Sequence, residues 1–333
     1  MNVQVSLSGA SYELGEHEVG YREAYRFAEK IARYEMLDDA EIWGWGRFFA
    51  SARDRTELAV ASARRTLSLT GCAGTDVDAV ILCATEFPSG VDHHARYCRV
   101  ILEALDLENA FVIGVTLGRC NTLLSAVHLA DRFVASQTYD RVLVIVSDRV
   151  ADEEQRFQQF ALFSDGAASC LVTSQPGDLG IIATASALDT AALDASGRFS
   201  GRLGRTAADT ITRRSGVRPD EVSAVLPPNV FMPIVRMSEG RSGFRPDQLY
   251  LRNIADRGHC FSADPLVNLV DRQHAHGARP GEYILLTSSV PGSRMSILAE
   301  VLDPAPPKTP PPKQDTKNRP TGRGCHDTEH RRG

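Results

Sequence analysis

The stretch FVIGVTLGRCNTLLSAVHLADRFVAS occupies residues 111–136 and decides the fold. It begins with a short run of apolar and small residues, passes through Gly118 and Arg119, and continues with apolar residues at the 3.6-residue period of an α-helix. The apolar face of that helix is so wide that little of it is left polar, which predicts a helix inside the molecule. The stretch therefore predicts a strand (111–117), a tight turn and a buried helix (121–136).

The rest of the chain up to residue 302 repeats this alternation of short apolar runs and helical patterns. Such alternation is typical of an α/β protein, and the nearly continuous apolar runs favour largely parallel, buried strands. The further expected strands are 77–83, 141–146, 169–173, 179–187, 222–226, 283–287 and 295–302. The further expected helices are 56–69, 95–105, 203–214 and 263–274.

A weak internal repeat relates the two halves of this region. Val77-Asp-Ala-Val returns as Val222-Ser-Ala-Val, and the strand expected at 141–146 has a counterpart at 283–287. Matches this short also arise by chance, so the pattern alone leaves duplication and coincidence equally open.

Composition limits the classes of protein to which the chain can belong. With 333 residues, 43% of them apolar, it is expected to fold into one large or two medium domains. The net charge of −5 argues against a nucleic-acid-binding face over the whole protein. Because no run approaches the length of a membrane span and the start does not resemble a signal peptide, we expect a cytoplasmic protein without a membrane partner. Residues 303–333 hold 7 of the 17 prolines, and we expect a disordered tail there.

The seven cysteines are irregularly spaced and contain no CxxC pair, so neither a disulfide framework nor a metal site is expected. Cys120 stands out because it precedes the buried helix. A sulfur at a helix N-terminus faces unpaired backbone N–H groups, which favour the thiolate over the thiol and could also hold an oxyanion. The same position is also compatible with an ordinary buried cysteine, and spacing alone does not decide between the two.

A second candidate is the loop that precedes the helix expected at 263–274. His259 is followed five residues later by Asp264, a spacing that can place a carboxylate on one imidazole nitrogen and leave the other free as a base. Asp264 also precedes Pro265, so it could instead be the N-cap of the helix. Cys260 is a rival nucleophile, although nothing places it at a helix N-terminus.

Three segments in this order resemble the β-ketoacyl-acyl-carrier-protein synthase III (ketosynthase III) branch of the thiolase superfamily. They are GVTLGRCN (114–121), RVLVIVSD (141–148) and FSDGAASC (163–170). The resemblance covers most of residues 50–302 and implies an α/β thiolase fold, in which two duplicated halves form a five-layered αβαβα arrangement. It implies a first half (1–174) with the nucleophile Cys120 and a second half (175–302) with His259 and Asp264.

The departures from this family are informative. Ketosynthase III enzymes carry a Cys-His-Asn set, whereas here Asn229 stands where that His belongs and His259 stands where that Asn belongs. With Asp264 added, the set resembles ketosynthase III-like acyltransferases of antibiotic biosynthesis and related starter-unit enzymes of aromatic polyketide pathways. The resemblance implies that His259, oriented by Asp264, is a base. It also implies that Gly292 supplies an oxyanion-binding N–H beside that of Cys120, and that Asn229 lines the pocket.

The function implied by this resemblance is acyl transfer. An acyl group would pass from acyl-carrier protein or acyl-CoA through an acyl-enzyme on Cys120 to a hydroxyl or amine of a small-molecule acceptor. No permanently bound cofactor and no metal are implied, since the phosphopantetheine arm arrives with the substrate, and a homodimer is expected. Two alternatives remain: a starter-unit ketosynthase that condenses with malonyl-carrier protein, and a non-catalytic partner subunit.

Overall fold

A computed structural model describes residues 3–193 and 201–303, so all but the first residue of the expected tail lies outside the described part. The strands are β1 (Ser6–Leu14), β2 (His17–Gly20), β3 (Arg47–Ala50), β4 (Ala79–Cys83), β5 (Phe111–Val115), β6 (Arg141–Asp148), β7 (Gly166–Thr173), β8 (Leu179–Leu188), β9 (Ala224–Leu226), β10 (Tyr283–Val290) and β11 (Ser293–Val301). The α-helices are α1 (Phe27–Arg33), α2 (Ala40–Trp43), α3 (Arg55–Thr70), α4 (Val91–Ala104), α5 (Thr122–Ala135), α6 (Gly201–Ser215), α7 (Met232–Arg241), α8 (Arg252–Asp256) and α9 (Asp264–His276).

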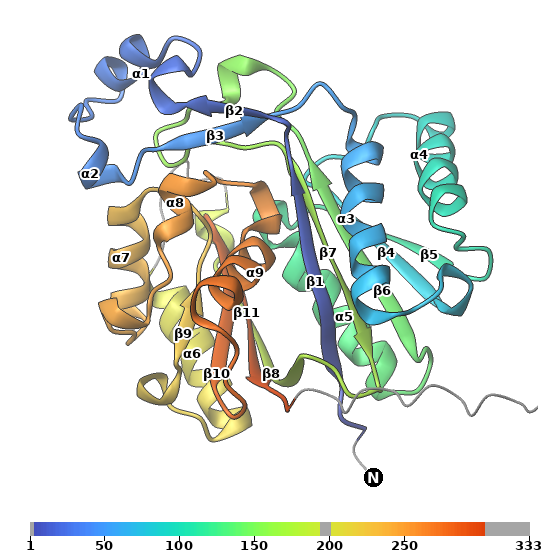
Figure 1. Cartoon of the computed structure of the whole chain (residues 1–333). Helices are drawn as coiled ribbons and strands as arrows, with labels where there is room; N and C mark the ends of the chain where they lie inside the picture. Colours follow the sequence, from blue (N-terminus) through green and yellow to red (C-terminus); the bar gives the residue numbers. More distant parts are fainter. Residues whose placement is uncertain (1–2, 194–200, 304–333) are drawn as a thin grey trace, which may run out of the picture.

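Nine strands form one sheet in the order β5-β4-β6-β7-β1-β8-β11-β10-β9, and β2 pairs with β3 (Figure 1). The order contains the same arrangement twice. In the first strand group, β4 runs parallel to β6, β6 antiparallel to β7, and β7 antiparallel to β1. In the second, β9, β10, β11 and β8 repeat these directions in this order. The duplication that the sequence left open is therefore present in the fold.

The two strand groups meet at β1 and β8, where only Ser6 with Gly180 and Leu7 with Leu179 are paired. All strands of the first group fall within residues 1–174 and all strands of the second within 175–302. The boundary at residue 174 stays a prediction.

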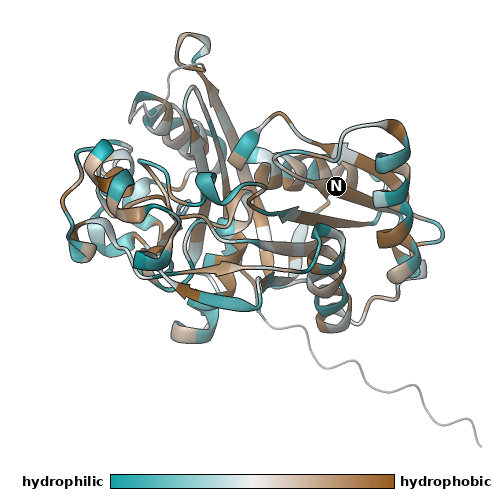
Figure 2. Cartoon of the chain, turned by 90° about the horizontal axis from the view of Figure 1, so that it is seen from above, coloured by the Kyte–Doolittle hydropathy of each residue, from teal (hydrophilic) through white to brown (hydrophobic). Residues whose placement is uncertain are grey.

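Alternating side chains divide the core into layers. Val144 of β6 and Ile297 of β11 face a common central core that contains α5 and α9. Their neighbours Leu143 and Leu298 face outward, where α3 and α4 cover the first group and α6 covers the second. Figure 1 shows α3 and α4 on one side and α6 on the other, and Figure 2 shows outer helices banded in hydrophilic and hydrophobic residues. The five-layered thiolase arrangement is thus confirmed.

The expectation of largely parallel strands is wrong. β4 runs parallel to β5 and β6, and β9 to β10, but all other neighbours in the nine-stranded sheet are antiparallel. The apolar runs that led to this expectation arise because helices cover both faces of each strand. Burial on both faces makes a strand apolar whichever way its neighbours run.

All the expected strands and helices are present, but three strands (β1, β2 and β3) and four helices (α1, α2, α7 and α8) were not expected from the sequence. The buried positions of β1 include Ser6, Ser8 and Ser11, so β1 does not form an apolar run. Ser11 donates to the carbonyl of Ser62 on α3 (2.8 Å), which shows how a hydroxyl can satisfy a buried strand position. No helix in the described part of the chain combines the length and apolar character needed to cross a bilayer.

The central helix layer can be tested by truncating a buried leucine. Leu123 on α5 is fully buried in the central core, whereas Leu69 on α3 is 63% exposed. We expect Leu123→Ala to lower the free energy of unfolding by about 2–5 kcal/mol, because it removes buried methyl groups and leaves a cavity. Leu69→Ala is the control and should change it by less than about 0.5 kcal/mol. Equal shifts of the two urea midpoints would contradict the layered core.

Candidate active site

Cys120 lies in a strained turn between β5 and α5. A 3-10 turn, η3 (Arg119–Asn121), precedes the helix, which begins at Thr122, one residue later than predicted. Leu117 and Arg119 adopt left-handed backbone conformations, with φ of 67° and 51°. This conformation costs an L-residue roughly 1–2 kcal/mol. The turn places the Cys120 thiol at the N-terminal end of α5, as the sequence predicts.

His259 lies in the loop between α8 and α9. Its backbone N–H donates to the carbonyl of Leu162 (2.8 Å), and its own carbonyl accepts from the N–H of Ser164 (2.9 Å). The preceding residue, Gly258, has a φ of +68°, and a Cβ there would lie 2.9 Å from the carbonyl oxygen of Leu162. A glycine is therefore required for the loop to approach residues 162–164 this closely.

The structure brings Cys120, His259 and Asp264 together in one line of contacts. The Sγ of Cys120 lies 3.4 Å from Nε2 of His259, and Nδ1 of His259 lies 2.5 Å from Oδ2 of Asp264. His259 and Asp264 are 1% and 0% exposed. The thiol comes from the first strand group and the dyad from the second, so the site lies where the two halves meet.

Four hydrogen bonds fix the Asp264 carboxylate. Oδ2 accepts from the backbone N–H of Asn229 (2.6 Å) and from His259, while Oδ1 accepts from the backbone N–H of Cys260 (2.7 Å) and from Nδ2 of Asn229 (3.4 Å). Asp264 is the first residue of α9, and the N-cap is Ala263. The carboxylate thus accepts hydrogen bonds from the imidazole and from backbone N–H groups of the neighbouring loops, and it does not cap the helix.

Burial and two neighbouring groups shift the pKa of His259 in opposite directions. Burial opposes its protonation, but the charges of Asp264 and Cys120, together with hydrogen bonds to both, raise its pKa to about 10. The ring centroid of Phe163 lies 4.8 Å from that of the imidazole, so one wall of this environment is apolar. At neutral pH the imidazole is therefore protonated.

Cys260 occupies a different environment from Cys120. It is fully buried, and burial, reinforced by the nearby carboxylate of Asp264, raises the pKa of its thiol well above the ordinary value. Its Sγ packs against Gly166, where an added Cβ would lie only 2.6 Å away. The glycine of the Phe163-to-Cys170 segment therefore makes room for the Cys260 thiol. Of the two cysteines, the structure places only Cys120 against His259.

Asn229 lies behind the dyad and is 1% exposed. Besides its contacts with Asp264, Nδ2 donates to the carbonyl of Gly258 (3.0 Å), and Oδ1 accepts from Nδ2 of Asn268 (3.0 Å). Its side-chain amide is thus used within the protein. This placement differs from the pocket-lining role expected from the sequence, which could not show that the amide faces α9.

Gly292 lies in the turn between β10 and β11 with a φ of +76°. Its carbonyl accepts from the N–H of Asp189 (2.7 Å), and an added Cβ would lie 2.7 Å from the backbone nitrogen of Leu193. The close approach of this neighbouring backbone therefore explains why residue 292 is a glycine. Its role as an oxyanion donor stays a prediction.

Sequence reasoning missed the residue that contacts the backbone of Cys120. Oγ of Ser288 donates to the carbonyl of Cys120 (2.7 Å) from β10. The only signal was that the apolar run of this strand ends in Thr287-Ser288-Ser289, which hinted at polar side chains facing inward.

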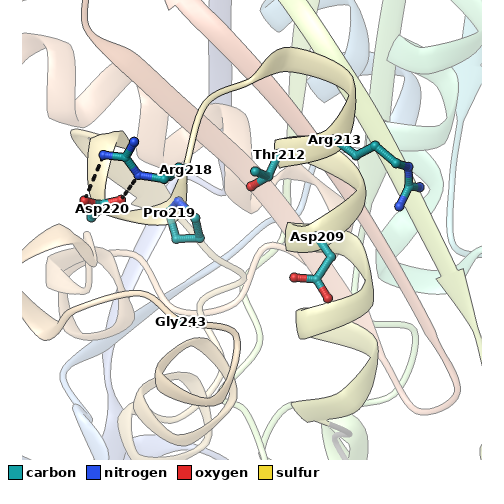
Figure 3. A pocket seen from close by; sticks show the side chains of 7 residues that line it. All are labelled: Asp209, Thr212, Arg213, Arg218, Pro219, Asp220 and Gly243. Carbon is teal, nitrogen blue, oxygen red and sulfur yellow. Dashed lines mark hydrogen bonds and ion pairs between the residues drawn. The ribbon is translucent and has the colours of Figure 1, made fainter.

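The described residues include no group of three or more His, Cys, Asp or Glu side chains that could hold a metal ion. An open cavity of about 540 Å³ lies against α6, on residues other than those of the candidate site. Figure 3 shows Arg218 bonded to Asp220 at one side of this cavity, with Asp209 and Thr212 on α6 at the other.

Residues 116–190, which include Cys120, match the family model of 3-oxoacyl-[acyl-carrier-protein (ACP)] synthase III. Over a longer span the chain is 23% identical to mycobacterial beta-ketoacyl-[acyl-carrier-protein] synthase III of Mycobacterium marinum, across 84% of this chain and 93% of that protein. It is 25% identical to beta-ketoacyl-[acyl-carrier-protein] synthase III of Ruegeria sp., across 80% and 92%. The chain is thus similar to ketosynthase III proteins over most of its length.

Solved structures share the fold of this chain. ChlB3, named an acyltransferase, superimposes with a TM-score of 0.78 at 16% identity, over 91% of this chain and 99% of that one. OleA from Xanthomonas campestris gives 0.75 at 15% identity, over 90% and 99%. The 3-oxoacyl-[acyl-carrier-protein] synthase III of Aquifex aeolicus gives 0.73 at 19%, over 89% and 99%.

The coupling between Cys120 and His259 predicts a titration that depends on the thiol. In the native protein the imidazole should stay protonated until the pH rises toward about 10. In Cys120→Ala, one of the two charges that raise its pKa is gone while burial remains, so His259 should lose its proton at a lower pH. Nitrogen-15 NMR of labelled histidine would measure both titrations. Coincident curves would show that the thiol does not act on the imidazole.

Proposed function

We propose that the chain is an acyltransferase that passes an acyl group from a thioester, through Cys120, to a hydroxyl or amine acceptor. The observation that carries this proposal is the line of contacts from Cys120 through His259 to Asp264. A thiol beside an imidazole that is oriented by a carboxylate is the arrangement of an activated nucleophile with its base.

In the first half-reaction the Cys120 thiolate attacks the carbonyl carbon of the donor thioester. The carbon–sulfur bond of the donor breaks, and its thiolate leaves. The proton on His259 then passes to this leaving thiolate, which departs as a neutral thiol. The products are an acyl thioester on Cys120 and a neutral imidazole.

In the second half-reaction the neutral imidazole is a base. Acylation has removed the negative charge on Cys120 that helped to raise the pKa of His259, while Asp264 still orients the ring. The Nε2 of His259 takes the proton of the acceptor hydroxyl or amine as its oxygen or nitrogen attacks the acyl carbon. The Cys120 thiolate leaves, and the imidazolium–thiolate pair is restored. The protons balance over the two steps.

The environment of Asn229 favours this reaction over decarboxylative condensation. Condensation needs donors that hold the malonyl thioester oxygen while an enolate develops, which is the work of the His and Asn in ketosynthase III enzymes. Here both protons of the Asn229 amide are directed at Gly258 and Asp264. A starter-unit ketosynthase would therefore need a second donor from elsewhere. A non-catalytic subunit has no need of a thiol in contact with a carboxylate-oriented imidazole.

Acyl-carrier protein or CoA is the proposed carrier of the acyl group. The relatives from Mycobacterium marinum and Ruegeria sp. are named for acyl-carrier protein, and a solved OleA variant holds lauroyl-CoA. ChlB3, named an acyltransferase, has the same fold as this chain. These likenesses support a donor with a phosphopantetheine arm. A place in antibiotic or polyketide biosynthesis is proposed from the resemblance of the sequence alone.

We also propose a homodimer through β5. This strand is one edge of the nine-stranded sheet, and Phe111 at its start is 60% exposed. Leu117, just beyond its end, is 92% exposed. An uncovered apolar edge strand is suited to pairing with a second copy across a two-fold axis.

The dimer can be tested by light scattering. At micromolar concentration the protein should scatter as twice its chain mass of 36.3 kDa. Ile113→Pro, which removes a backbone N–H in the middle of β5, should shift it toward the monomer. Glu103→Pro would break α4 instead and serves as the control for general disruption. A native protein that scatters as a single chain would rule out the β5 pairing.

The second half-reaction predicts how variants of the dyad behave. His259→Ala should still accept the acyl group on Cys120 but pass it to the acceptor at least ~100-fold more slowly, the usual size of general-base loss. Asp264→Asn should show the same pattern, because an amide no longer stabilises the imidazolium. Asn229→Ala should be milder, since the backbone N–H of residue 229 still holds Asp264.

Single-turnover transfer from the isolated acyl-enzyme measures these rates, and the release of carbon dioxide from malonyl-carrier protein is followed in parallel. Transfer at the native rate in His259→Ala would contradict the role of the base. Carbon dioxide release would instead support the starter-unit ketosynthase.

A further inference from the structure

The turn that carries Cys120 needs support from outside itself. Leu117 and Arg119 both adopt left-handed backbone conformations although neither is glycine, so the turn is strained. Strain of this kind persists only where the surrounding structure holds it. Within the turn, the N–H of Asn121 donates to the carbonyl of Gly118 (2.9 Å), which closes the 3-10 turn but does not anchor it.

Anchoring contacts come from the hairpin of β10 and β11. Ser288 donates to the carbonyl of Cys120 (2.7 Å) and is 1% exposed. Nδ2 of Asn121 donates to Oγ of Ser293 (3.1 Å), and the guanidinium of Arg119 donates to the carbonyl of Pro291 (2.5 Å). Three consecutive residues of the turn are thus each bonded to one hairpin of the second strand group.

The buried side chain of Asn121 is only partly hydrogen-bonded. It is 3% exposed, and among the described residues its Oδ1 is one of the buried side-chain atoms without a hydrogen-bond partner. An unsatisfied buried acceptor destabilises the folded state. An apolar residue would avoid this destabilisation but could not donate to Ser293. The hydrogen bond to Ser293, rather than the packing of the side chain, therefore explains why an amide is found at residue 121.

We propose that Ser288 and the Asn121–Ser293 pair are positioning residues, which hold the strained turn so that the Cys120 thiol stays against His259. The proposal rests on the proposed function, in which Cys120 is the nucleophile. The hydroxyl of Ser288 fixes the carbonyl of Cys120, and Asn121 fixes the residue that follows. Neither is assigned a contact with substrate. Without them the turn can relax, and the distance of 3.4 Å between Sγ and Nε2 is no longer imposed.

The test compares Ser288→Ala and Ser293→Ala with Ser169→Ala. Ser169 is fully buried and its hydroxyl is bonded to Ser62 (2.8 Å) and Thr66 (2.7 Å), so its loss removes buried hydrogen bonds to α3 rather than to the turn. Iodoacetamide alkylation of Cys120, followed by peptide mass, is measured at pH 6.5 and pH 9.5. A free cysteine thiol, with a pKa of about 8.5, is largely protonated at pH 6.5 and largely ionised at pH 9.5. A variant that separates the thiol from the imidazolium should therefore lose reactivity mainly at the lower pH.

We expect Ser288→Ala and Ser293→Ala to slow alkylation on the order of 5- to 10-fold at pH 6.5 and less than about twofold at pH 9.5, the scale of one buried hydrogen bond. Ser169→Ala should match the native protein at both pH values. Native rates for both hairpin variants at pH 6.5, or equal slowing at the two pH values, would overturn the proposal. The proposed function fails separately if native Cys120 reacts no faster at pH 6.5 than Cys120 in His259→Ala.

Discussion

The contact between the Cys120 thiol and the His259 imidazole lies where the two halves of the molecule meet, and the rest of the site is arranged around it. The two strand groups share only two paired positions at β1 and β8. Duplication makes α5 and α9 equivalent central helices, and the site is built where they begin. Cys120 lies in the turn before α5, and Asp264 is the first residue of α9. One half thus supplies the nucleophile and the other supplies its base.

Asp264 explains why the exchange of imidazole and amide relative to ketosynthase III enzymes is chemically coherent. Its carboxylate is saturated by the imidazole, by Asn229 and by the N–H of Cys260. Four hydrogen-bond donors hold this fully buried carboxyl group in a fixed position. It keeps the imidazole protonated while the thiolate is present, and it still orients the ring once acylation has removed that charge. Asn229, in the place of the family's histidine, has become part of this support.

Much of this could be predicted from the sequence, and the gaps have physical causes. The strand, turn and helix around Cys120 followed from local periodicity, and the pairing of His259 with Asp264 followed from their spacing. Strand direction did not follow, because burial by helices on both faces erases the difference between parallel and antiparallel strands. β1 was missed because serines fill its buried positions. The contacts of Ser288 and Asn229 depend on which long-range partner each one faces, and no local pattern encodes that.

The central claim is that Cys120 carries the acyl group. Its most direct test is the intact mass of the protein after exposure to a panel of acyl-CoA and acyl-carrier-protein thioesters, with peptide mapping of the modified cysteine. The account predicts one acyl group on Cys120, loss of loading in Cys120→Ala, and native loading in Cys260→Ala. An acyl group mapped to Cys260, or loading that survives Cys120→Ala, would contradict it.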